Sequence, residues 1–252
     1  MENKEESGSF EGQRNPEDSG VAELHAAAAE ARADPGWSVE PEAAVRLQAT
    51  LADRVIRGNR LGPVRRVAGV DVGLPGNRAR AAVVVLDYPS LSPVDFATAD
   101  GPVPYPYVPG LLSFREGPVI LAAMEKLSVA PDLFIFDGQG IAHPRRLGIA
   151  SHIGVLIDRP TIGCAKSRLC GRHGPVPPSP GEYAPLVLDG ETVGAVLRTR
   201  DGVKPVFVSP GHRVDLTAGI AWVLACCRGY KLPETTRWAH RVAGGRTPPI
   251  QD

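Results

Sequence analysis

The segment 134–144 reads FIFDGQGIAHP, and it indicates the fold better than any other stretch of the chain. The short apolar run at 133–136 predicts a buried strand that delivers Asp137 to its carboxyl end. Gly138 and Gly140 then allow the backbone to turn sharply and to approach a ligand closely. A carboxylate at the carboxyl end of a central strand is typical of the functional sites of α/β enzymes.

Two more carboxylates have similar surroundings. Asp71 lies in the run VAGVDVG at 67–73, and Glu116 ends the run PYVPGLLSFRE at 106–116. Each carboxylate has an ordinary alternative: a structural turn for Asp71, a favourable helix macrodipole for Glu116, and an Asx turn for Asp137. Together they predict a site for Mg²⁺, with Mn²⁺ as a substitute, because hard cations prefer oxygen ligands. Metals held in this way can activate water against a phosphodiester.

The hydrophobic patterns predict an α/β fold, in which a mixed sheet with an antiparallel meander and parallel strands is flanked by helices. Strands are expected at 65–72, 80–86, near 95–98, at 133–136 and at 161–164, and two or three more between 183 and 208. Helices are expected from residue 41 onward and near 114–127, 147–156, 214–227 and 234–243. The residues Ser-Pro-Gly-His at 209–212 are interpreted as a turn that leads into a helix.

The chain is expected to form a single catalytic domain at 36–246, between a disordered acidic tail at 1–35 and a short tail at 247–252. Residues 1–20 are rich in Glu, Ser, Gly, Asn and Asp, a composition typical of disorder. The alanine-rich segment 21–33 could be a helix that the following Asp-Pro-Gly ends. Residues 1–40 hold ten acidic and three basic side chains, so the remainder of this neutral chain is basic. A basic body suits a polyanionic partner, although uneven surface charge would give the same pattern.

The composition is that of a globular protein. The chain has 252 residues and an apolar fraction of 43%, which is enough for a sizeable core. No apolar run approaches the roughly 18 residues that a membrane span requires, and the polar N-terminus does not resemble a secretory signal. The four cysteines form no Cys-x-x-Cys pair. We therefore expect reduced thiols in a cytoplasmic protein, and a monomer.

Three further side chains could assist the carboxylates. Lys166 follows the strand at 161–164 and could orient water or contact a phosphate, or be an ordinary surface lysine. His212 could bind metal or transfer a proton, or simply neighbour a helix N-cap. His143 stands close to the glycine turn. The remaining candidates lack comparable surroundings and are expected to be structural or surface residues: His152, His173 and His240.

The segment 106–110, Pro-Tyr-Val-Pro-Gly, is stiffened by two prolines. A rigid tip that carries Tyr107 could wedge into a base step of a nucleic acid. The alternative is a buried turn in which Tyr107 packs on the core.

These motifs together resemble the endonuclease V family. The matching pieces follow the family order between about residues 41 and 244: Val70-Asp71, the segment 106–110, Phe114-Arg115-Glu116, Asp137-Gly138-Gln139-Gly140 with His143-Pro144 and Gly148, Gly163-Cys164-Ala165-Lys166-Ser167, and Ser209-Pro210-Gly211-His212. Several separated motifs agree, which makes the resemblance specific.

The resemblance implies an RNase H-like fold and Mg²⁺-dependent cleavage of DNA near deoxyinosine, the product of adenine deamination. The cut would fall at the second phosphodiester on the 3′ side and leave 3′-hydroxyl and 5′-phosphate ends. Asp71, Glu116 and Asp137 would hold the metal, and Lys166 and His212 would assist catalysis. The substrate would be contacted by the wedge residues Pro106, Tyr107, Val108 and Pro109, and by Gly110, Leu112, Gly140, His143 and Leu169 at the hypoxanthine pocket.

Other functions remain open at this point. The substrate could be inosine-containing RNA in place of DNA. A non-catalytic RNase H-like binding module would keep the wedge but lose the carboxylates, and all three are present. A general metal-dependent phosphoesterase would need neither wedge nor base pocket.

Overall fold

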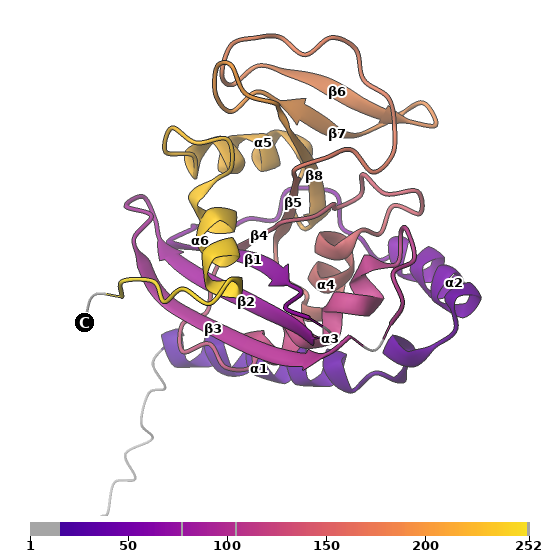
Figure 1. Cartoon of the computed structure of the whole chain (residues 1–252), viewed down its shortest axis with the longest axis vertical. Coiled ribbons are helices and arrows are strands. Elements are labelled where there is room, and N and C mark those ends of the chain that lie inside the picture. The colour runs from indigo at the N-terminus through magenta and orange to yellow at the C-terminus, as the bar shows by residue number, and fades with distance from the viewer. Residues whose placement is uncertain (1–15, 77, 104, 251–252) are drawn as a thin grey trace, which may run out of the picture.

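The computed structural model describes residues 16–76, 78–103 and 105–250. An eight-stranded sheet runs through the molecule in the order β3-β2-β1-β4-β5-β8-β7-β6 (Figure 1). The strands are β1 (Arg66–Gly73), β2 (Arg78–Asp87), β3 (Pro93–Pro102), β4 (Leu133–Phe136), β5 (Thr161–Ala165), β6 (Tyr183–Leu188), β7 (Glu191–Leu197) and β8 (Val206–His212). The predicted α/β fold with a mixed, RNase H-like sheet is confirmed.

The centre of the sheet is parallel and its two sides are antiparallel. β1 pairs with β4 and β4 with β5 in parallel, whereas β1–β2 and β2–β3 form the predicted meander. On the other side, β8 runs antiparallel to β5, and β7 and β6 extend the sheet further. The carboxyl ends of the three parallel strands therefore meet at one edge, where ligands bind in open α/β sheets.

Helices cover both faces of the sheet. α1 (Pro16–Ala33), the short 3₁₀ helix η1 (Pro35–Ser38), α2 (Pro41–Ala52), α3 (Leu112–Met124) and α4 (Ile149–Ile157) share one core with alternate strand residues such as Val70 and Phe136. α5 (Leu216–Ala225) and α6 (Glu234–Ala243) pack on the opposite face with Val67 and Ile135. Figure 1 shows α6 lying across β1 and β2, with α1 on the far side. Because both faces are covered, the central strands are apolar almost throughout.

Two glycines of β1 let α6 lie directly on the sheet. A Cβ at Gly69 would stand 1.9 Å from the carbonyl oxygen of Thr235, and one at Gly73 would stand 3.2 Å from that of Ala243. Side chains alternate along a strand, so Gly69, Asp71 and Gly73 share one face. Asp71 therefore points toward α6.

The folded domain begins earlier in the chain than the predicted boundary at residue 36. α1 is an ordered helix, and its Leu24, Ala28 and Ala31 are buried in the main core. Ion pairs also join α1 to its neighbours, Arg32 to Glu125 at 2.5 Å and Glu23 to Arg159 at 2.8 Å. The helix that the segment 21–33 could form is confirmed, but it belongs to the folded domain and not to a disordered tail. Alanines spaced along one helix face can bury a helix without large side chains. The predicted disorder of residues 1–15 lies outside the described residues.

The prediction was also wrong at residues 209–212. These residues belong to β8, and they continue its pairing with β5 as far as His212 opposite Thr161. Proline and glycine suggested a turn, yet Pro210 and Gly211 lie in the strand where it crosses closely over Gly140 and Thr161. Among the helices of the described chain, none is long and apolar enough to cross a membrane.

Candidate functional site

Two of the predicted carboxylates meet at the carboxyl edge of the sheet. Val70 of β1 pairs with Phe136 of β4, and the Asp137 amide donates to the Val70 carbonyl at 2.9 Å. The residues that follow, Asp71 and Asp137, consequently stand side by side on adjacent strands. Their side chains are 11% and 12% exposed. Two acidic groups are thus held together in a largely desolvated place.

Glu116 comes to the same place from α3. This helix begins at Leu112, and no acidic residue lies in its first turn. A helix that began at residue 114, as expected, would have Glu116 in its first turn. The helix starts two residues earlier, so the macrodipole does not account for Glu116. Asp71, Glu116 and Asp137 are called the carboxylate cluster below.

The members of the carboxylate cluster disturb one another's ionisation. Burial, followed by the charges of Asp71 and Asp137, raises the pKa of Glu116 to about 8, against an opposing effect of Arg115. Burial and the charge of Asp137 likewise raise the pKa of Asp71, although its hydrogen bond to His240 opposes them. Burial, and like charges that share a site, produce such shifts, and they are frequent at functional sites.

Two side chains with nitrogen donors, Lys166 and His240, face the cluster. The Nζ of Lys166 lies 2.5 Å from Oδ2 of Asp137, and Nδ1 of His240 donates to Oδ2 of Asp71 at 2.7 Å. Burial lowers the pKa of Lys166, but the hydrogen bond and the charges of Asp137 and Asp71 outweigh it and raise the pKa. Lys166 is therefore charged at neutral pH and partly neutralises the cluster.

The donor set fits a divalent cation of the hard class. Three carboxylates offer oxygen ligands only, as Mg²⁺ and Mn²⁺ prefer, and the raised pKa values of Asp71 and Glu116 show that added positive charge would be favourable. Within the described residues, no group of three His, Cys, Asp or Glu side chains is arranged to hold a metal as it stands. Lys166 occupies Oδ2 of Asp137, so its side chain would have to turn aside if a metal took that oxygen.

A pocket of roughly 430 Å³ opens beside the cluster, and Asp137 forms part of its wall. This size is in the range of small-molecule sites. Six of the residues that were predicted to contact substrate line it: Tyr107, Val108, Gly110, Leu112, His143 and Leu169. Lys166 lines it as well, so the pocket and the carboxylate cluster are continuous.

The other predicted contact residues lie elsewhere. Pro106 and Pro109 are exposed on the loop that ends at the pocket. Gly140 is buried behind the wall, where a Cβ would stand 1.9 Å from the Pro210 carbonyl, and its amide donates to Oγ of Ser209 at 2.8 Å. Gly140 therefore lets β8 approach the glycine turn and does not itself face the pocket.

The wedge loop, residues 106–110, presents Tyr107 at its tip. Tyr107 is 70% exposed, so the alternative in which it packs on the core is wrong. The guanidinium of Arg115 lies 5.8 Å from the centre of its ring. The loop ends at Gly110, whose φ of +82° is a conformation that favours glycine.

The structure does not bring His212 to the carboxylates. His212 pairs with Thr161, the first residue of β5, and Thr161 pairs with Phe134 of β4. His212 therefore lies near the amino ends of β4 and β5, whereas Asp137 follows the carboxyl end of β4. His212 is buried, and it accepts from the Ile56 amide at Nδ1 and faces Asp158 at 3.1 Å through Nε2. The interpretation of 209–212 as a turn, in place of a strand, led to the incorrect placement.

The histidine that reaches the cluster is His240, which was expected to be a structural or surface residue. A signal for it is present in β1, where glycines flank Asp71 two positions away on each side. Small residues on one face of a strand indicate a helix packed closely over it. A histidine on the last helix of the domain is then a natural partner for Asp71. Further pocket residues were missed, among them Gln48 and Gln139.

Comparison with known proteins agrees with this arrangement. Residues 49–241 match the family model of endonuclease V. An endonuclease V of Roseiflexus sp. (strain RS-1) is 54% identical over 216 residues, which cover 85% of this chain and 97% of that protein. The crystal structure of endonuclease V from Streptomyces avermitilis has a TM-score of 0.80 at 46% identity, covering 84% of this chain and 94% of that one.

A more distant structure is that of Ciona intestinalis endonuclease V in complex with a 24mer DNA that contains an inosine followed by a ribo-adenosine. It has a TM-score of 0.66 at 28% identity, covering 79% of this chain and 94% of that one. Fold, site and sequence agree, and the match covers nearly the full length of these relatives. The chain therefore belongs to the endonuclease V family and is a nuclease, a hydrolase that acts on phosphodiester bonds.

Proposed function

We propose that this nuclease is a divalent-metal-dependent DNA repair enzyme that recognises deoxyinosine and hydrolyses the second phosphodiester on its 3′ side. The products would carry 3′-hydroxyl and 5′-phosphate ends. The observation that carries the proposal is the shared wall: Asp137 belongs both to the pocket and to the carboxylate cluster. A base held in the pocket would keep its own strand beside the carboxylates.

Asp71, Glu116 and Asp137 would hold Mg²⁺, or Mn²⁺ in its place. Bound there, the metal would supply an activated water and would stabilise the charge that develops on the phosphate. Lys166, charged and next to Asp137, would contact a phosphate oxygen or orient the water once its own ion pair opens. His240 would hold Asp71 in position through Nδ1.

The pocket would select hypoxanthine by shape and hydrogen bonding. Hypoxanthine lacks the exocyclic amine of guanine, so a tight wall excludes guanine by steric clash. Its O6 accepts hydrogen bonds where adenine presents an amine, so amide donors in the wall would reject adenine. Extrusion costs least for a mispaired base, which adds to the selectivity. Tyr107 would fill the space that the extruded base leaves in the stack.

A second candidate substrate is inosine-containing RNA. The Ciona relative is bound to DNA in which a ribonucleotide follows the inosine, so a ribose is accommodated next to the lesion in that protein. A non-catalytic binding module is not supported, because the chain belongs to a nuclease family and keeps all three carboxylates. The four free cysteines suit a reducing, cytoplasmic location.

A cleavage assay on matched strands tests the proposal. Inosine-containing DNA, the same sequence with inosine in RNA, abasic DNA and undamaged DNA are each incubated with Mg²⁺ or with a chelator, and the product ends are mapped. We expect metal-dependent cutting of the inosine DNA at the second 3′ phosphodiester. Equal cutting of undamaged DNA would contradict the role of the pocket, and a preference for the RNA would select the second candidate.

A further inference from the structure

Three side chains converge on one backbone oxygen at the base of the wedge loop. The Gly110 carbonyl accepts hydrogen bonds from Nε2 of Gln48 at 3.0 Å, Nε2 of His143 at 2.9 Å and Nη2 of Arg145 at 2.8 Å. A carbonyl oxygen has two lone pairs, so three donors saturate it. The position of Gly110 is therefore fixed from α2 and from the loop that follows the glycine turn.

The three donors also hold one another. Nε of Arg145 donates to Oε1 of Gln48 at 2.5 Å, and the Arg145 amide donates to Nδ1 of His143 at 3.2 Å. Gln48 is 1% exposed, and its Nε2 also reaches the Leu147 carbonyl at 3.3 Å. Burial and the charge of Arg145 lower the pKa of His143 to about 4, so its ring is neutral, with the proton on the donating Nε2. The network is closed, since each polar atom of Gln48 has a partner.

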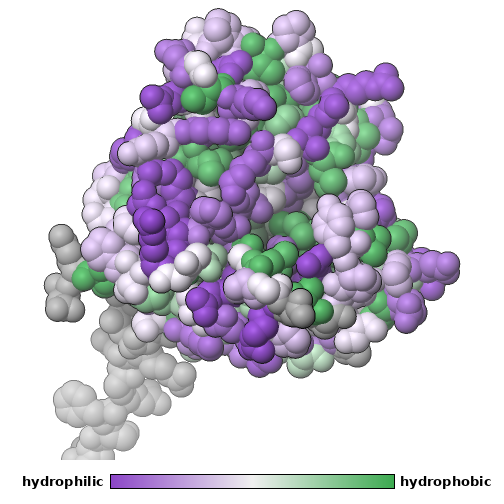
Figure 2. Space-filling view, in the orientation of Figure 1, coloured by the Kyte–Doolittle hydropathy of each residue, from purple (hydrophilic) through white to green (hydrophobic). Residues whose placement is uncertain are grey.

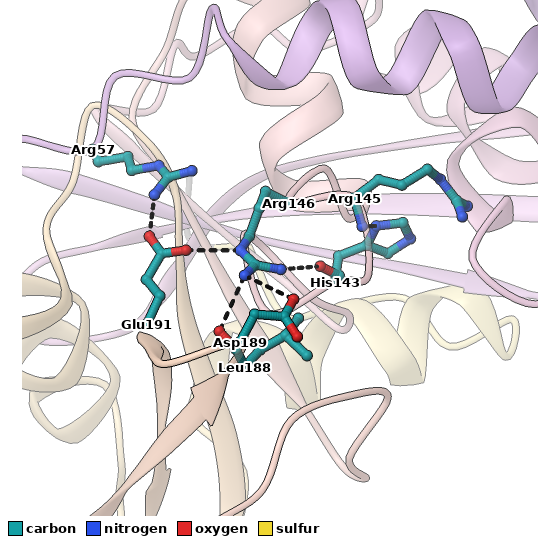
Figure 3. Close-up of polar contacts among 7 residues, drawn as sticks. All are labelled: Arg57, His143, Arg145, Arg146, Leu188, Asp189 and Glu191. Carbon is teal, nitrogen blue, oxygen red and sulfur yellow. Dashed lines mark hydrogen bonds and ion pairs between the residues drawn. The ribbon is translucent and has the colours of Figure 1, made fainter.

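A second set of contacts fixes the loop that carries Arg145. In Figure 3, Arg145 and the following Arg146 point in different directions, and Arg146 reaches the turn between β6 and β7. Arg146 donates to Glu191 at 2.9 Å and to the Leu188 carbonyl at 3.1 Å, and Glu191 also pairs with Arg57. Arg146 has a φ of +57°, which a non-glycine residue rarely adopts without external support.

The consequence concerns the wedge. Tyr107 lies three residues before Gly110, and prolines at 106 and 109 restrict the backbone between them. A loop that is stiff along its length and fixed at its base can place its tip in only a few positions. A preorganised loop binds with a smaller entropic cost than a mobile one.

We propose that Gln48 and Arg145 are positioning residues that act through the Gly110 carbonyl to hold the wedge loop ready for an inosine-containing duplex. Neither residue takes part in hydrolysis. The proposal rests on the proposed function for its substrate, but the positioning of the loop is a property of the free protein. Both can therefore be tested separately.

The first measurement uses the free protein. Gln48→Met preserves the length of the side chain and removes its amide, so that Gly110 loses one donor and Arg145 loses an acceptor. Hydrogen–deuterium exchange should become at least tenfold faster at the Leu111 amide, which donates to the Val108 carbonyl within the loop. Arg46→Met, on the exposed side of the same helix, is the matched control and should leave this exchange unchanged.

The second measurement separates binding from chemistry. With an inosine-containing duplex, Gln48→Met should raise KM about tenfold and change kcat less than twofold, whereas a single-stranded inosine substrate should be affected less. Arg145→Lys keeps the charge but cannot reach both Gln48 and Gly110, so it should give the same pattern. It serves as the second variant if Gln48→Met folds poorly. Wild-type exchange and wild-type KM in a folded variant would overturn the proposal, as would a loss confined to kcat. Failure of the wild-type enzyme to cut inosine strands would instead overturn the proposed function, with the exchange result still deciding the positioning role.

Discussion

At the scale of single residues, the two histidines at 212 and 240 have opposite surroundings. His240 is 67% exposed at its side chain and touches the carboxylate cluster, whereas His212 is buried between Ile56 and Asp158. Burial lowers the pKa of His212 despite its contact with Asp158. His240 is therefore placed to affect the rate of cleavage, and His212 to affect the stability of the folded protein.

Paired substitutions should separate these roles. His240→Gln should reduce the rate of inosine-strand cleavage at least tenfold and leave the unfolding midpoint almost unchanged, because an exposed side chain adds little to the core. His212→Gln should lower the unfolding midpoint and retain most of the rate in the protein that remains folded. Single-turnover cleavage and thermal unfolding of both variants measure the two effects. The reverse pattern would restore His212 to the site.

At the scale of elements, the approach of α6 to β1 decides whether His240 can reach Asp71. Gly69 makes that approach possible, since its missing side chain leaves room for the Thr235 carbonyl. Gly69→Ala should therefore push α6 outward, lower the free energy of unfolding by more than about 2 kcal/mol, and slow cleavage. Denaturant unfolding provides the measurement, and Gly219→Ala is the control because its Cβ would meet only ordinary contacts near 3.8 Å. Equal stability of both variants would contradict the close packing of α6.

The helix α1 offers a second element to test. Leu24 is 1% exposed in the main core, so Leu24→Ala should cost about 2–5 kcal/mol of unfolding free energy. Glu30→Ala, on the exposed side of α1, should have little effect. Denaturant midpoints of the two variants compare them directly. If Leu24→Ala matches the control, α1 is not part of the cooperative fold, and the predicted domain boundary at residue 36 would be correct.

These elements show what the sequence could predict. The apolar run before Asp137 and the alternation in β1 and β2 report burial directly, so the sheet and the meeting of Asp71 with Asp137 could be predicted. Turn-forming residues inside β8 and small residues along α1 misled the prediction, because proline, glycine and alanine are used there for close packing between distant segments. Gln48 was not predicted either, because its role depends on a contact with the Gly110 carbonyl, 62 residues away in the sequence.

At the scale of the whole molecule, buried neutral histidines connect stability to pH. Burial lowers the pKa of His152 to about 3 and that of His143 to about 4. The unfolded chain therefore binds protons below about pH 6.5 that the folded protein does not, and stability is lost as the pH falls from there toward 4. His152 donates to or accepts from Oγ of Ser113 at 2.8 Å and stacks on Trp37, which joins α3, α4 and η1.

Replacement of His152 should reduce this acid sensitivity. Between pH 6 and 4, His152→Gln should lessen the slope of unfolding free energy against pH by about 1.4 kcal/mol per pH unit, the value for one proton. The exposed His173→Gln should leave the slope unchanged. Denaturant unfolding at several pH values measures both. A slope that is the same in all three proteins would show that His152 is not the source.

The central proposal concerns the whole molecule. The sheet and α3 bring Asp71, Asp137 and Glu116 together, where they would hold a metal that cleavage requires, next to a pocket that would bind the lesion independently. The most direct test is the Mg²⁺ dependence of single-turnover cleavage of an inosine-containing strand by the wild-type protein and Asp137→Asn, with strand binding measured in parallel. Asp137→Asn keeps the shape and removes one charge, so the rate should fall by several orders of magnitude while binding persists. Near-normal, Mg²⁺-dependent turnover in the variant would contradict the account.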